Sequence, residues 1–513
     1  MGSPPRPSGL RANALPLRLP SCTKESVARE IIPHTAPSSL QSMSLLNFVL
    51  VSGLMAAVGL WAFRQPFSPA TRRWILLSLA VLLALQLLSE GFYWQFLPGY
   101  LLLALISLWP PTSWRLFRTL CLGALAAAFL AVWALPPVPR LTAPRGSYAV
   151  GTNIYRWVDL TRPEEATTNP SDHRNVVVQA WYPATENVQA PTAPYIDGLG
   201  RLPAYVSILP RFVWSKYHKI QSHGLLGLPL AASQPKWPVV LFSPGYGASR
   251  AFYTSLLTDL ASKGFVVLAL DHPYESAVVE LADQQIVGPI EDFARYGVDR
   301  GAYMTAHQQL RAADLSFVLD QLHSGDKSRN DISPDFLARL DLAHISAIGH
   351  SFGGASAALA LSRDARIQAA ANIDGTLYGT LPRTSLQKPF LLLQSDPAET
   401  HHSERYLSGN QQLFENLQAP GYRIEIRGAN HFSFTDVPLF FSPPARWILS
   451  FFVGGPRDVS ETHHLSADIL AAFLQPSPSG QPASLEAVLR RYPNVIGGPW
   501  KQSPPSPSPS QPE

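Results

Sequence analysis

The sequence predicts an α/β fold, with a mostly parallel sheet and helices on both of its faces, preceded by an all-α transmembrane region. Three observations lead to this expectation. Four apolar runs with almost no charge lie between residues 44 and 135. Beyond them, short segments rich in valine, isoleucine and leucine alternate with segments of helical periodicity, as in parallel sheets. A glycine-rich turn around residue 351 joins one such strand to a helix.

The chain divides into four expected parts. The first residues are rich in serine, proline and arginine without periodicity, and Met43 opens directly onto the first apolar run, as a natural start codon would. The tail alternates serine with proline. The expected parts are a disordered N-terminal segment at 1–42, a membrane region at 43–138, one domain at 139–500 and a disordered tail at 501–513.

Composition argues against several classes of function. With 40 basic and 36 acidic side chains, the net charge of +4 is small for 513 residues and comes partly from arginines beside the apolar runs. It gives no reason to expect a nucleic-acid partner. The two cysteines, Cys22 and Cys121, are too few for a disulfide framework or a zinc site and offer no thiol nucleophile. We therefore expect no metal and no organic cofactor, and nothing in the sequence specifies an oligomeric state.

Four apolar runs predict membrane spans. They cover residues 44–63, 74–89, 96–109 and 116–135. Two are long enough to cross a bilayer unaided and two are slightly short. Tryptophan and tyrosine lie near their ends, where interfacial aromatic residues are common. We expect four spans, with three as the alternative, and the lipid bilayer as a partner of the chain.

Arginines set the expected orientation of these spans. Basic residues crowd the first and third connections, whereas the second, around 90–98, has none. The arginines concerned are Arg64, Arg72, Arg73, Arg115 and Arg118. Because basic loops stay in the cytoplasm, a four-span region has both ends on the outer face. The sequence thus predicts a multi-pass protein of a bacterial inner membrane, with everything after Arg140 on the periplasmic or extracytoplasmic side. With three spans, the two ends of the membrane region would lie on opposite sides of the bilayer.

A strand, a serine turn and a helix follow one another in residues 345–361. The run Gly349-His350-Ser351-Phe352-Gly353 lies between an apolar strand and an alanine-rich helix, which is the setting of a nucleophile elbow in the α/β-hydrolase fold. The glycines leave room for a serine held at a strained backbone angle. We expect Ser351 to be the nucleophile. The backbone N–H of Phe352, at the start of the helix, is expected to stabilise an oxyanion.

A base and an acid are expected downstream, because this fold places them in the order serine, carboxylate, histidine. His431 lies in a loop that directly follows the short strand at 423–427, so it is the expected general base. Four other histidines stand in polar surroundings and are expected to face solvent, namely His401, His402, His463 and His464.

Two aspartates compete for the role of the acid. Asp374 and Asp396 each end a strand-like run, and either could orient the imidazole. Asp396 sits where most hydrolases of this type place the acid. Asp374 lies in an Asp-Gly-Thr turn that would aim its carboxylate into the site, so Asp374 is the favoured acid and Asp396 the alternative. The other aspartate is then expected to cap a turn.

The second oxyanion donor is expected from a loop upstream of the elbow. The apolar strand at 239–242 runs into a loop at 243–249, where Gly245 lets the backbone turn its amides inward. The N–H of Tyr246 would then join that of Phe352 against the tetrahedral intermediate.

Two further segments are expected to belong to the sheet. Residues 176–183 alternate as an antiparallel strand at its start. Asp271 and His272 end a buried strand upstream of the elbow. Because the order of the chain argues against a catalytic role there, we expect a role at the strand end or in a substrate loop.

Two features of the remaining sequence are expected near the surface. Arg311 and Asp314 lie on a helix at 302–322 and are expected to form a surface pair. The insertion at 195–238 carries apolar side chains, which either cover the active site and meet an acyl or lipid chain or pack on the domain.

These motifs resemble those of the platelet-activating-factor acetylhydrolases, which are serine esterases with an α/β-hydrolase fold. The matching pieces lie within about 145–455 and are Leu241-Phe242-Ser243-Pro244-Gly245-Tyr246-Gly247, Asp259-Leu260-Ala261-Ser262-Lys263-Gly264-Phe265-Val266-Val267, Gly349-His350-Ser351-Phe352-Gly353-Gly354, Ile373-Asp374 and Gly428-Ala429-Asn430-His431. The resemblance implies that Asp374 is the acid and that Tyr246 and Phe352 supply the oxyanion donors. One departure is Pro244, because the family often has a histidine before the oxyanion-loop glycine.

Together these residues predict a carboxylic ester hydrolase that works through an acyl-enzyme. His431, held by Asp374, would take the proton of Ser351 as it attacks an ester carbonyl, and water would release the acyl group. The resemblance implies short-acyl or phospholipid-type esters as substrates. The alternatives are a polyester or dienelactone-type hydrolase and, from another class, a noncatalytic hydrolase-like binding module on a membrane tether.

Overall fold

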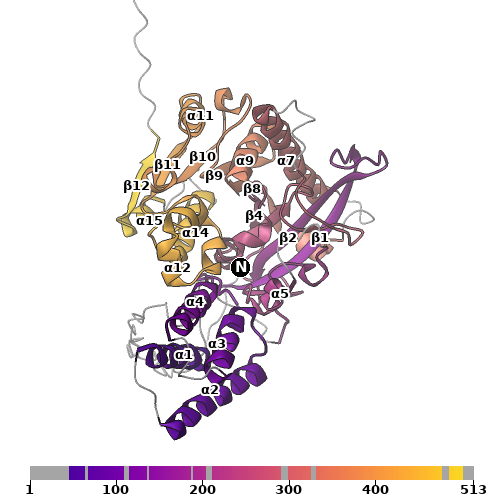
Figure 1. Cartoon of the computed structure of the whole chain (residues 1–513). Coiled ribbons are helices and arrows are strands. Elements are labelled where there is room, and N and C mark those ends of the chain that lie inside the picture. The colour runs from indigo at the N-terminus through magenta and orange to yellow at the C-terminus, as the bar shows by residue number, and fades with distance from the viewer. Residues whose placement is uncertain are drawn as a thin grey trace, which may run out of the picture. The chain divides into compact units, whose positions relative to one another are not determined.

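The computed structural model describes residues 45–63, 68–108, 115–133, 135, 138–185, 189–203, 211–290, 299–324, 331–475 and 485–500. Figure 1 shows helices alone at the start of the described chain and a mixed α/β unit after them. The segments expected to be disordered, 1–42 and 501–513, and the expected start at Met43 lie outside the described residues, so those expectations stay predictions.

Four helices occupy the positions of the four apolar runs. They are α1 (Leu45–Phe63), α2 (Pro69–Ser89), α3 (Leu97–Leu108) and α4 (Arg115–Trp133). Their buried side chains form a core with the short helix η1 (Trp94–Phe96), in which the rings of Phe96 and of Phe129 on α4 meet edge to face, with centroids 5.7 Å apart. Apolar side chains also face outward, such as Leu88 and Leu108, which are 85% and 83% exposed.

Bilayer crossing is a separate question from helix formation. Among the described residues, one helix, α2, is long and apolar enough to span a membrane, with 21 residues. The shorter apolar stretches are Leu45–Leu60, Trp94–Leu108 and Thr119–Leu130. The helices themselves are as expected, whereas the number of membrane spans stays a prediction.

The α/β unit is built on one sheet in the order β12-β11-β10-β9-β8-β4-β5-β2-β1-β3. Its strands are β1 (Ala149–Pro163), β2 (His173–Ala184), β3 (Gly224–Leu226), β4 (Trp237–Ser243), β5 (Val266–Asp271), β8 (Leu340–His350), β9 (Ile367–Ile373), β10 (Phe390–Ser395), β11 (Gly421–Ile426) and β12 (Val495–Pro499). Neighbours from β5 through β4 to β11 are parallel, and β2 pairs antiparallel with both β1 and β5. The predicted mostly parallel sheet with an antiparallel start is confirmed.

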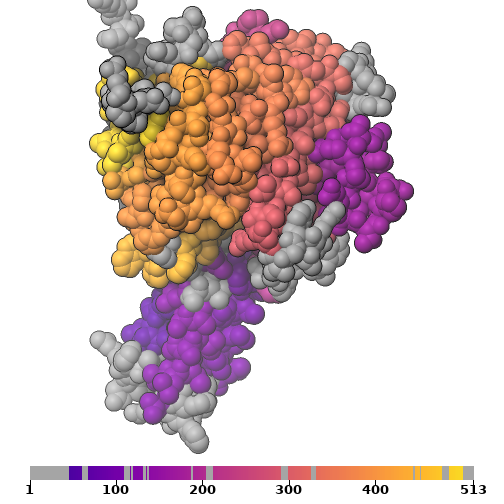
Figure 2. Space-filling view, turned by 90° about the horizontal axis from the view of Figure 1, so that it is seen from above, coloured from indigo at the N-terminus to yellow at the C-terminus, as the bar shows by residue number. Residues whose placement is uncertain are grey.

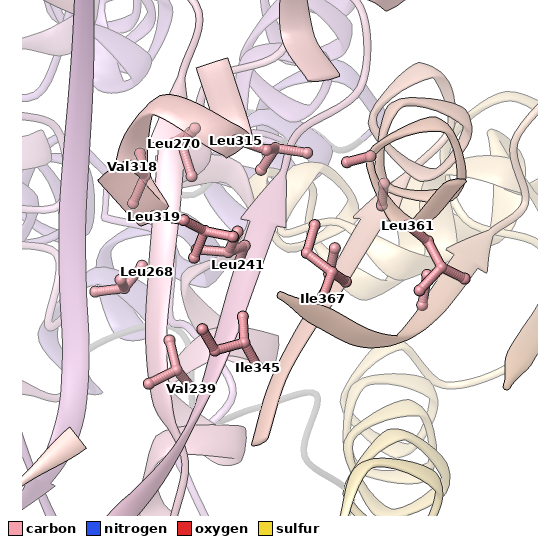
Figure 3. Close-up of a cluster of buried hydrophobic side chains, with 14 of the residues drawn as sticks. Val239, Leu241, Leu268, Leu270, Leu315, Val318, Leu319, Ile345, Leu361 and Ile367 are labelled. Atoms are coloured by element: carbon pink, nitrogen blue, oxygen red, sulfur yellow. The ribbon is translucent and has the colours of Figure 1, made fainter. Parts of the chain in front are cut away.

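Helices cover both faces of this sheet. One face carries α7 (Arg300–His323), α9 (Phe352–Arg363) and α11 (Glu404–Glu415), and the other carries α6 (Thr254–Ser262), α14 (Val459–Leu474) and α15 (Leu485–Arg491). Figure 3 shows the core of the first face, where Leu315 and Leu319 of α7 lie over Leu241 of β4. In Figure 2 the red and orange segments, which include α7, α9 and α11, lie side by side on one face of the unit. The carboxyl ends of the parallel strands therefore emerge between two helical layers.

The described part of the predicted insertion packs on the α/β unit. Its strand β3 pairs with β1 and extends the sheet by one strand. Tyr195, Tyr217 and Ile220 are buried in a small cluster with Leu439. Of the two expectations for the insertion, packing on the domain is the one that these residues fulfil.

Arg311 and Asp314 do not form a surface pair, so that prediction is wrong. Both side chains are fully buried. Asp314 accepts hydrogen bonds from Arg174 at 2.7 Å and from His272 Nδ1 at 2.8 Å. Burial opposes the ionisation of Asp314, but Arg174 and His272 outweigh it and hold the pKa of this carboxyl well below its usual range. These partners lie far away in the sequence, so the periodicity of the helix could not reveal them.

Three buried histidines make the fold sensitive to acid. Burial lowers the pKa of His272 to about 4, of His350 to about 3 and of His463 to about 4. An unfolded histidine titrates near pH ~6.5. Between pH ~6.5 and about 4, these histidines bind more protons in the unfolded chain than in the folded protein. The stability that their neutral rings contribute is therefore complete above pH ~6.5 and is lost as the pH falls toward about 4. Asp436 has the opposite effect on stability. Burial raises its pKa to about 7, so the folded protein binds a proton here before the unfolded chain does and gains stability as the pH falls.

With three histidines against one aspartate, we expect the free energy of unfolding to fall between about pH 6.5 and 4.5. Urea titrations of the full chain in detergent at several pH values would measure this slope. His463→Gln removes one titrating ring and should make the slope shallower, whereas His344→Gln removes an exposed histidine and should not. A free energy of unfolding that is constant or rises on acidification would contradict the account.

Candidate active site

Ser351 lies on a sharp turn between β8 and α9. Its backbone has φ 56° and ψ −124°, a positive-φ conformation that is costly for a residue with a Cβ atom. Glycines on either side make the turn possible. A Cβ on Gly349 would lie 2.3 Å from the backbone of Gly353, and a Cβ on Gly353 would lie 2.0 Å from the carbonyl oxygen of Ser243. The close packing of β8, α9 and β4 therefore fixes where Ser351 presents its hydroxyl.

The structure brings together three of the residues singled out from the sequence. His431 Nε2 lies 3.0 Å from Ser351 Oγ, and His431 Nδ1 lies 2.7 Å from Asp374 Oδ2. His431 begins the short helix η7 (His431–Phe434) after β11, and Asp374 follows the end of β9 with φ 55°. An unbroken chain of hydrogen bonds thus runs from the serine hydroxyl through the imidazole to a fully buried carboxylate.

Asp396, the alternative acid, holds the backbone near this chain. Its Oδ1 caps α10 (Pro397–Thr400) by accepting from the Ala398 N–H at 3.0 Å, and its Oδ2 accepts from the Gly428 N–H at 2.9 Å. The Asp396 N–H in turn donates to the carbonyl of Ala429 at 2.8 Å. Asp396 therefore anchors the loop that leads to His431, as a capping aspartate does.

Asp374 is surrounded by donors. The N–H and the hydroxyl of Ser395 both lie 2.9 Å from Oδ1, and His402 Nε2 lies 2.8 Å from the same oxygen. Burial opposes the ionisation of this carboxyl, but the hydrogen bonds from His402 and His431 outweigh it, so its pKa lies well below the usual range. Asp374 is therefore a stable anion although its side chain is buried.

Two of the four histidines expected to face solvent are buried, so the prediction is wrong for them. The side chain of His402 is 4% exposed and contacts Asp374, and His463 is 1% exposed. His401 is exposed as expected, and His464 is partly exposed. The polar neighbours of these histidines in the sequence were misleading, because their partners in space come from other elements.

A second chain of hydrogen bonds ties the oxyanion loop to the elbow and to the base. The Gly245 N–H donates to the Tyr253 hydroxyl at 3.0 Å, and this hydroxyl lies 2.8 Å from His350 Nδ1. His350 Nε2 lies 2.9 Å from the carbonyl oxygen of His431. Burial, then the nearby His431, lower the pKa of His350 to about 3, so it stays neutral, with Nδ1 accepting and Nε2 donating.

Arg311 clamps the two parts of the expected oxyanion hole. Its guanidinium donates to the carbonyl of Pro244 at 2.6 Å and lies 4.8 Å from the ring centroid of Phe352. It also donates to Glu275 at 2.7 Å, and the Glu275 carbonyl accepts from the Gly247 N–H. One buried ion pair therefore fixes the loop that carries Tyr246 and the first residue of α9. As the first residue of that helix, Phe352 has an N–H without an intrahelical acceptor.

A second serine, histidine and aspartate arrangement lies inside the protein. Ser243 Oγ lies 2.9 Å from His272 Nε2, and His272 Nδ1 lies 2.8 Å from Asp314. All three side chains are fully buried, so no ester can reach them. Asp271 accepts from Ser249 and Arg250 and is buried as well. The hydrogen bonds of the serine, histidine and aspartate arrangement connect the ends of β4 and β5 to α7. Access to solvent distinguishes Ser351 from Ser243.

A cavity of about 300 Å³ opens beside Ser351. Its described lining residues are Tyr246, Arg300, Met304, Ser351, Phe352, Asp374, Thr376, Tyr378, Thr400, His401, His402, Ser403, Tyr406 and His431. They come from the loops that follow β4, β8 and β9, from α7, α9, α10, α11 and η7, and from the turn between α10 and α11. The described part of the insertion at 195–238 contributes none of them. Within the described ranges, no group of three or more His, Cys, Asp or Glu could hold a metal ion.

Four residues that hold the site were not predicted for this role from the sequence, namely Tyr253, Arg311, His350 and His402. His350 carried a signal, because the residue before the serine of an elbow must lie beside the nucleophile. The other three have no local signal, since each reaches the site from a different element.

Known proteins that resemble this chain are esterases. A family model described as platelet-activating factor acetylhydrolase, isoform II, matches residues 138–481. A probable 1-alkyl-2-acetylglycerophosphocholine esterase of Arthroderma benhamiae is 26% identical over 339 residues, which cover 60% of this chain and 78% of that protein. The platelet-activating factor acetylhydrolase of Cavia porcellus is 25% identical over 280 residues, which cover 50% of this chain and 63% of that protein.

A solved structure gives the same result for the fold. The ferulic acid esterase from Streptomyces cinnamoneus superposes with a TM-score of 0.54 at 28% identity, covering 70% of this chain and 99% of that protein. The α/β-hydrolase fold and the family resemblance expected from the sequence are thereby confirmed.

Proposed function

This chain belongs to the platelet-activating factor acetylhydrolase, isoform II, family, and on that premise we propose which residues carry out its chemistry. The protein is a serine-dependent carboxylic ester hydrolase. The proposed nucleophile is Ser351, the general base His431 and the acid Asp374. The observation that carries the proposal is the unbroken hydrogen-bonded chain of these three side chains at the edge of a cavity.

In the proposed acylation step, Ser351 Oγ attacks the ester carbonyl carbon while His431 Nε2 takes the hydroxyl proton. The bond to the leaving alcohol then breaks, and the proton passes from His431 to the alcohol oxygen. Water attacks the acyl-enzyme in the second step, again losing its proton to His431, and Ser351 is restored. Asp374 remains ionised throughout and stabilises the imidazolium.

The proposed oxyanion donors are the backbone N–H groups of Tyr246 and Phe352. Two contacts support this assignment. Arg311 holds both the Tyr246 loop and the Phe352 ring, and the hydroxyl of Tyr253 holds the neighbouring Gly245. Donors that are fixed before the reaction stabilise the developing charge without reorganising, which is where most of the rate enhancement of such enzymes arises.

We propose short-acyl or phospholipid-type esters as substrates. The cavity of about 300 Å³ lies at the lower end of the range of roughly 300–1,000 Å³ that is usual for ligand pockets. An acetyl group fits within it, whereas a long acyl chain would have to leave it. The name of the relative from Arthroderma benhamiae specifies an acetyl ester. The hydrogen-bonded chain at Ser351 disfavours a noncatalytic binding module, and a polyester or dienelactone-type hydrolase remains the alternative among enzymes.

We also propose that residues 43–138 anchor the catalytic domain, 139–500, in a bacterial inner membrane. The support is the apolar character of α1 to α4, with α2 long enough to span a bilayer, and the arginines at the first and third connections. Four spans place the catalytic domain on the periplasmic side. An anchor of this kind keeps the cavity near amphipathic esters.

Substitutions in the proposed triad test the assignment. With p-nitrophenyl acetate and the full chain in detergent, Ser351→Ala should lower kcat/KM by roughly 10⁴- to 10⁶-fold. Asp374→Asn should lower kcat by about 10⁴-fold, because the amide favours the wrong tautomer of His431. Asp396→Asn serves as the comparison, because asparagine can still cap α10 but can accept from only one of the Ala398 and Gly428 N–H groups. Its kcat should therefore fall by far less than that of Asp374→Asn, by about tenfold at most. Retained activity in Ser351→Ala would disprove the assignment.

The size of the cavity predicts the acyl preference. Across p-nitrophenyl esters from acetate to palmitate, kcat/KM should fall by at least about tenfold once the acyl chain exceeds the cavity. Met304 lines the cavity and is buried, so Met304→Ala should extend the activity to longer chains. A wild-type enzyme that prefers palmitate would contradict the proposed substrate class.

Labelling with a membrane-impermeant maleimide tests the topology. In a background with Cys22→Ser and Cys121→Ser, a cysteine replaces Ser408 on α11 or Thr71 at the start of α2, both of which are exposed. In intact spheroplasts, Ser408→Cys should react, whereas Thr71→Cys should react only after permeabilisation. The reverse pattern, or equal labelling of both, would overturn the proposed orientation.

A further inference from the structure

The carboxylate of Asp374 accepts hydrogen bonds from two imidazoles. His431 occupies Oδ2 at 2.7 Å, and His402 Nε2 lies 2.8 Å from Oδ1. An ionised carboxylate only accepts hydrogen bonds, so Nε2 of His402 carries the proton. The side chain of His402 is 4% exposed and that of Asp374 is fully buried, so this contact is shielded from bulk solvent. A charge-assisted hydrogen bond in such surroundings is stronger than one in water.

The turn between α10 and α11 places His402 beside Asp374. Strand β10 ends at Ser395, and the short helix α10 stops at His401, which has the left-handed conformation with φ 51°. Such a conformation costs free energy in a residue other than glycine. It reverses the chain so that His402 points back to the end of β9, and Ser403 then caps α11 through the Tyr406 N–H.

Several contacts fix the ring of His402. It stacks on the ring of Tyr406, with centroids 3.9 Å apart and planes 10° from parallel. The Tyr406 hydroxyl itself lies 3.4 Å from Asp374 Oδ1, and Ser395 Oγ lies 3.2 Å from His402 Nε2. The other ring nitrogen of His402, Nδ1, is buried and has no hydrogen-bond partner in the part of the chain that the structure describes. The polar contacts of the ring are therefore made by Nε2, and the shorter of them is the one with Asp374.

We propose that His402 is a positioning residue of the hydrolase, which fixes the plane of the Asp374 carboxylate and tunes the basicity of His431. The inference rests on the roles proposed above for Ser351, His431 and Asp374. The hydrogen bond from His402 joins those from the N–H and the hydroxyl of Ser395 at Oδ1. Together they hold the carboxylate so that Oδ2 stays aligned with His431 Nδ1. The hydrogen bond from His402 also draws negative charge toward Oδ1, which weakens the pull of Asp374 on the imidazolium of His431. Removal of His402 should therefore strengthen the interaction of Asp374 with the imidazolium of His431.

The charged and titratable groups that line the cavity with His402 show how a change at His402 can reach His431. They are Asp374 after β9, His431 on η7, Tyr406 on α11, Arg300 on α7, and His401 and Tyr378 in the adjoining loops. Asp374 is the one carboxylate among the described residues that line the cavity. A change at His402 therefore reaches His431 through Asp374.

Two substitutions separate positioning from packing. His402→Phe keeps a ring to stack on Tyr406 but removes the donor, whereas His402→Gln places an amide N–H near the position of Nε2. We expect His402→Phe to lower kcat on p-nitrophenyl acetate by about tenfold, as for loss of one hydrogen bond to a charged group, with KM changed by less than about twofold. The acid limb of the pH profile of kcat/KM should move to higher pH. His402→Gln should recover most of kcat and move the limb back.

A matched control is His344→Phe. His344 Nδ1 also contacts an aspartate, Asp341, at 2.7 Å, but this pair is exposed on β8 away from Ser351. It should match wild type in kcat and in the pH profile. Titration of reactive serines with a fluorophosphonate gives the number of competent sites in every preparation, so that kcat is expressed per site even where a variant is less stable.

The outcomes distinguish this inference from the proposed function. A lower kcat per site in His402→Phe, a shifted acid limb and rescue by His402→Gln support a positioning role. If both variants keep the wild-type kcat per site and pH profile and differ only in thermal stability or in the number of competent sites, His402 has a structural role and the inference fails. If Ser351→Ala remains active, the proposed function fails instead.

Discussion

The buried negative charge of Asp374 is the interaction on which the site depends. An isolated carboxylate inside a protein is strongly unfavourable, so it persists only where donors replace water. Here the donors come from separate elements, with Ser395 at the end of β10, His402 before α11, Tyr406 on α11 and His431 on η7. Each element must be in place for the charge to be tolerated. The hydrogen bonds that stabilise the Asp374 carboxylate at this end of the sheet therefore also position the base and the acid of the proposed triad.

A second set of buried charges holds the other side of the cavity. Arg311 pairs with Glu275 and contacts both Pro244 and Phe352, while Arg174 pairs with Asp314 on the same helix, α7. Removing one partner of such a pair leaves an uncompensated charge and typically costs ~3–5 kcal/mol. The oxyanion loop and the elbow are thus fixed to α7 from one side, and the proposed base and acid are fixed by Asp374 from the other. Ser351 stands between the two networks, on a turn that the packing of Gly353 against Ser243 allows in one conformation.

Much of this arrangement could be predicted from the sequence, for reasons that particular residues make clear. The elbow at Ser351 and the loop at His431 are local patterns in which strand, glycine and functional side chain are neighbours in the chain. The sequence wrongly predicts Arg311 and Asp314 on the surface and His402 in solvent, because the partners of these residues are distant in the chain. Arg174 and Asp314 are 140 positions apart, and His402 lies 28 positions from Asp374. Hydrophobic periodicity reports which face of an element is apolar, but it carries no information on which charges meet inside. The apolar helices before residue 138 illustrate another limit, since composition predicts helices there without fixing how many cross a bilayer.

The central claim is that Ser351 forms a covalent acyl-enzyme. The most direct measurement is to mix the full chain with a short-acyl p-nitrophenyl ester, quench with acid during turnover and locate the acyl group by mass spectrometry of peptides. The account predicts one acyl group per chain on the peptide that contains Ser351, and no acylated peptide when Ser351 is replaced by alanine. An acyl group on another residue, or rapid turnover with no acylated peptide at all, would contradict it.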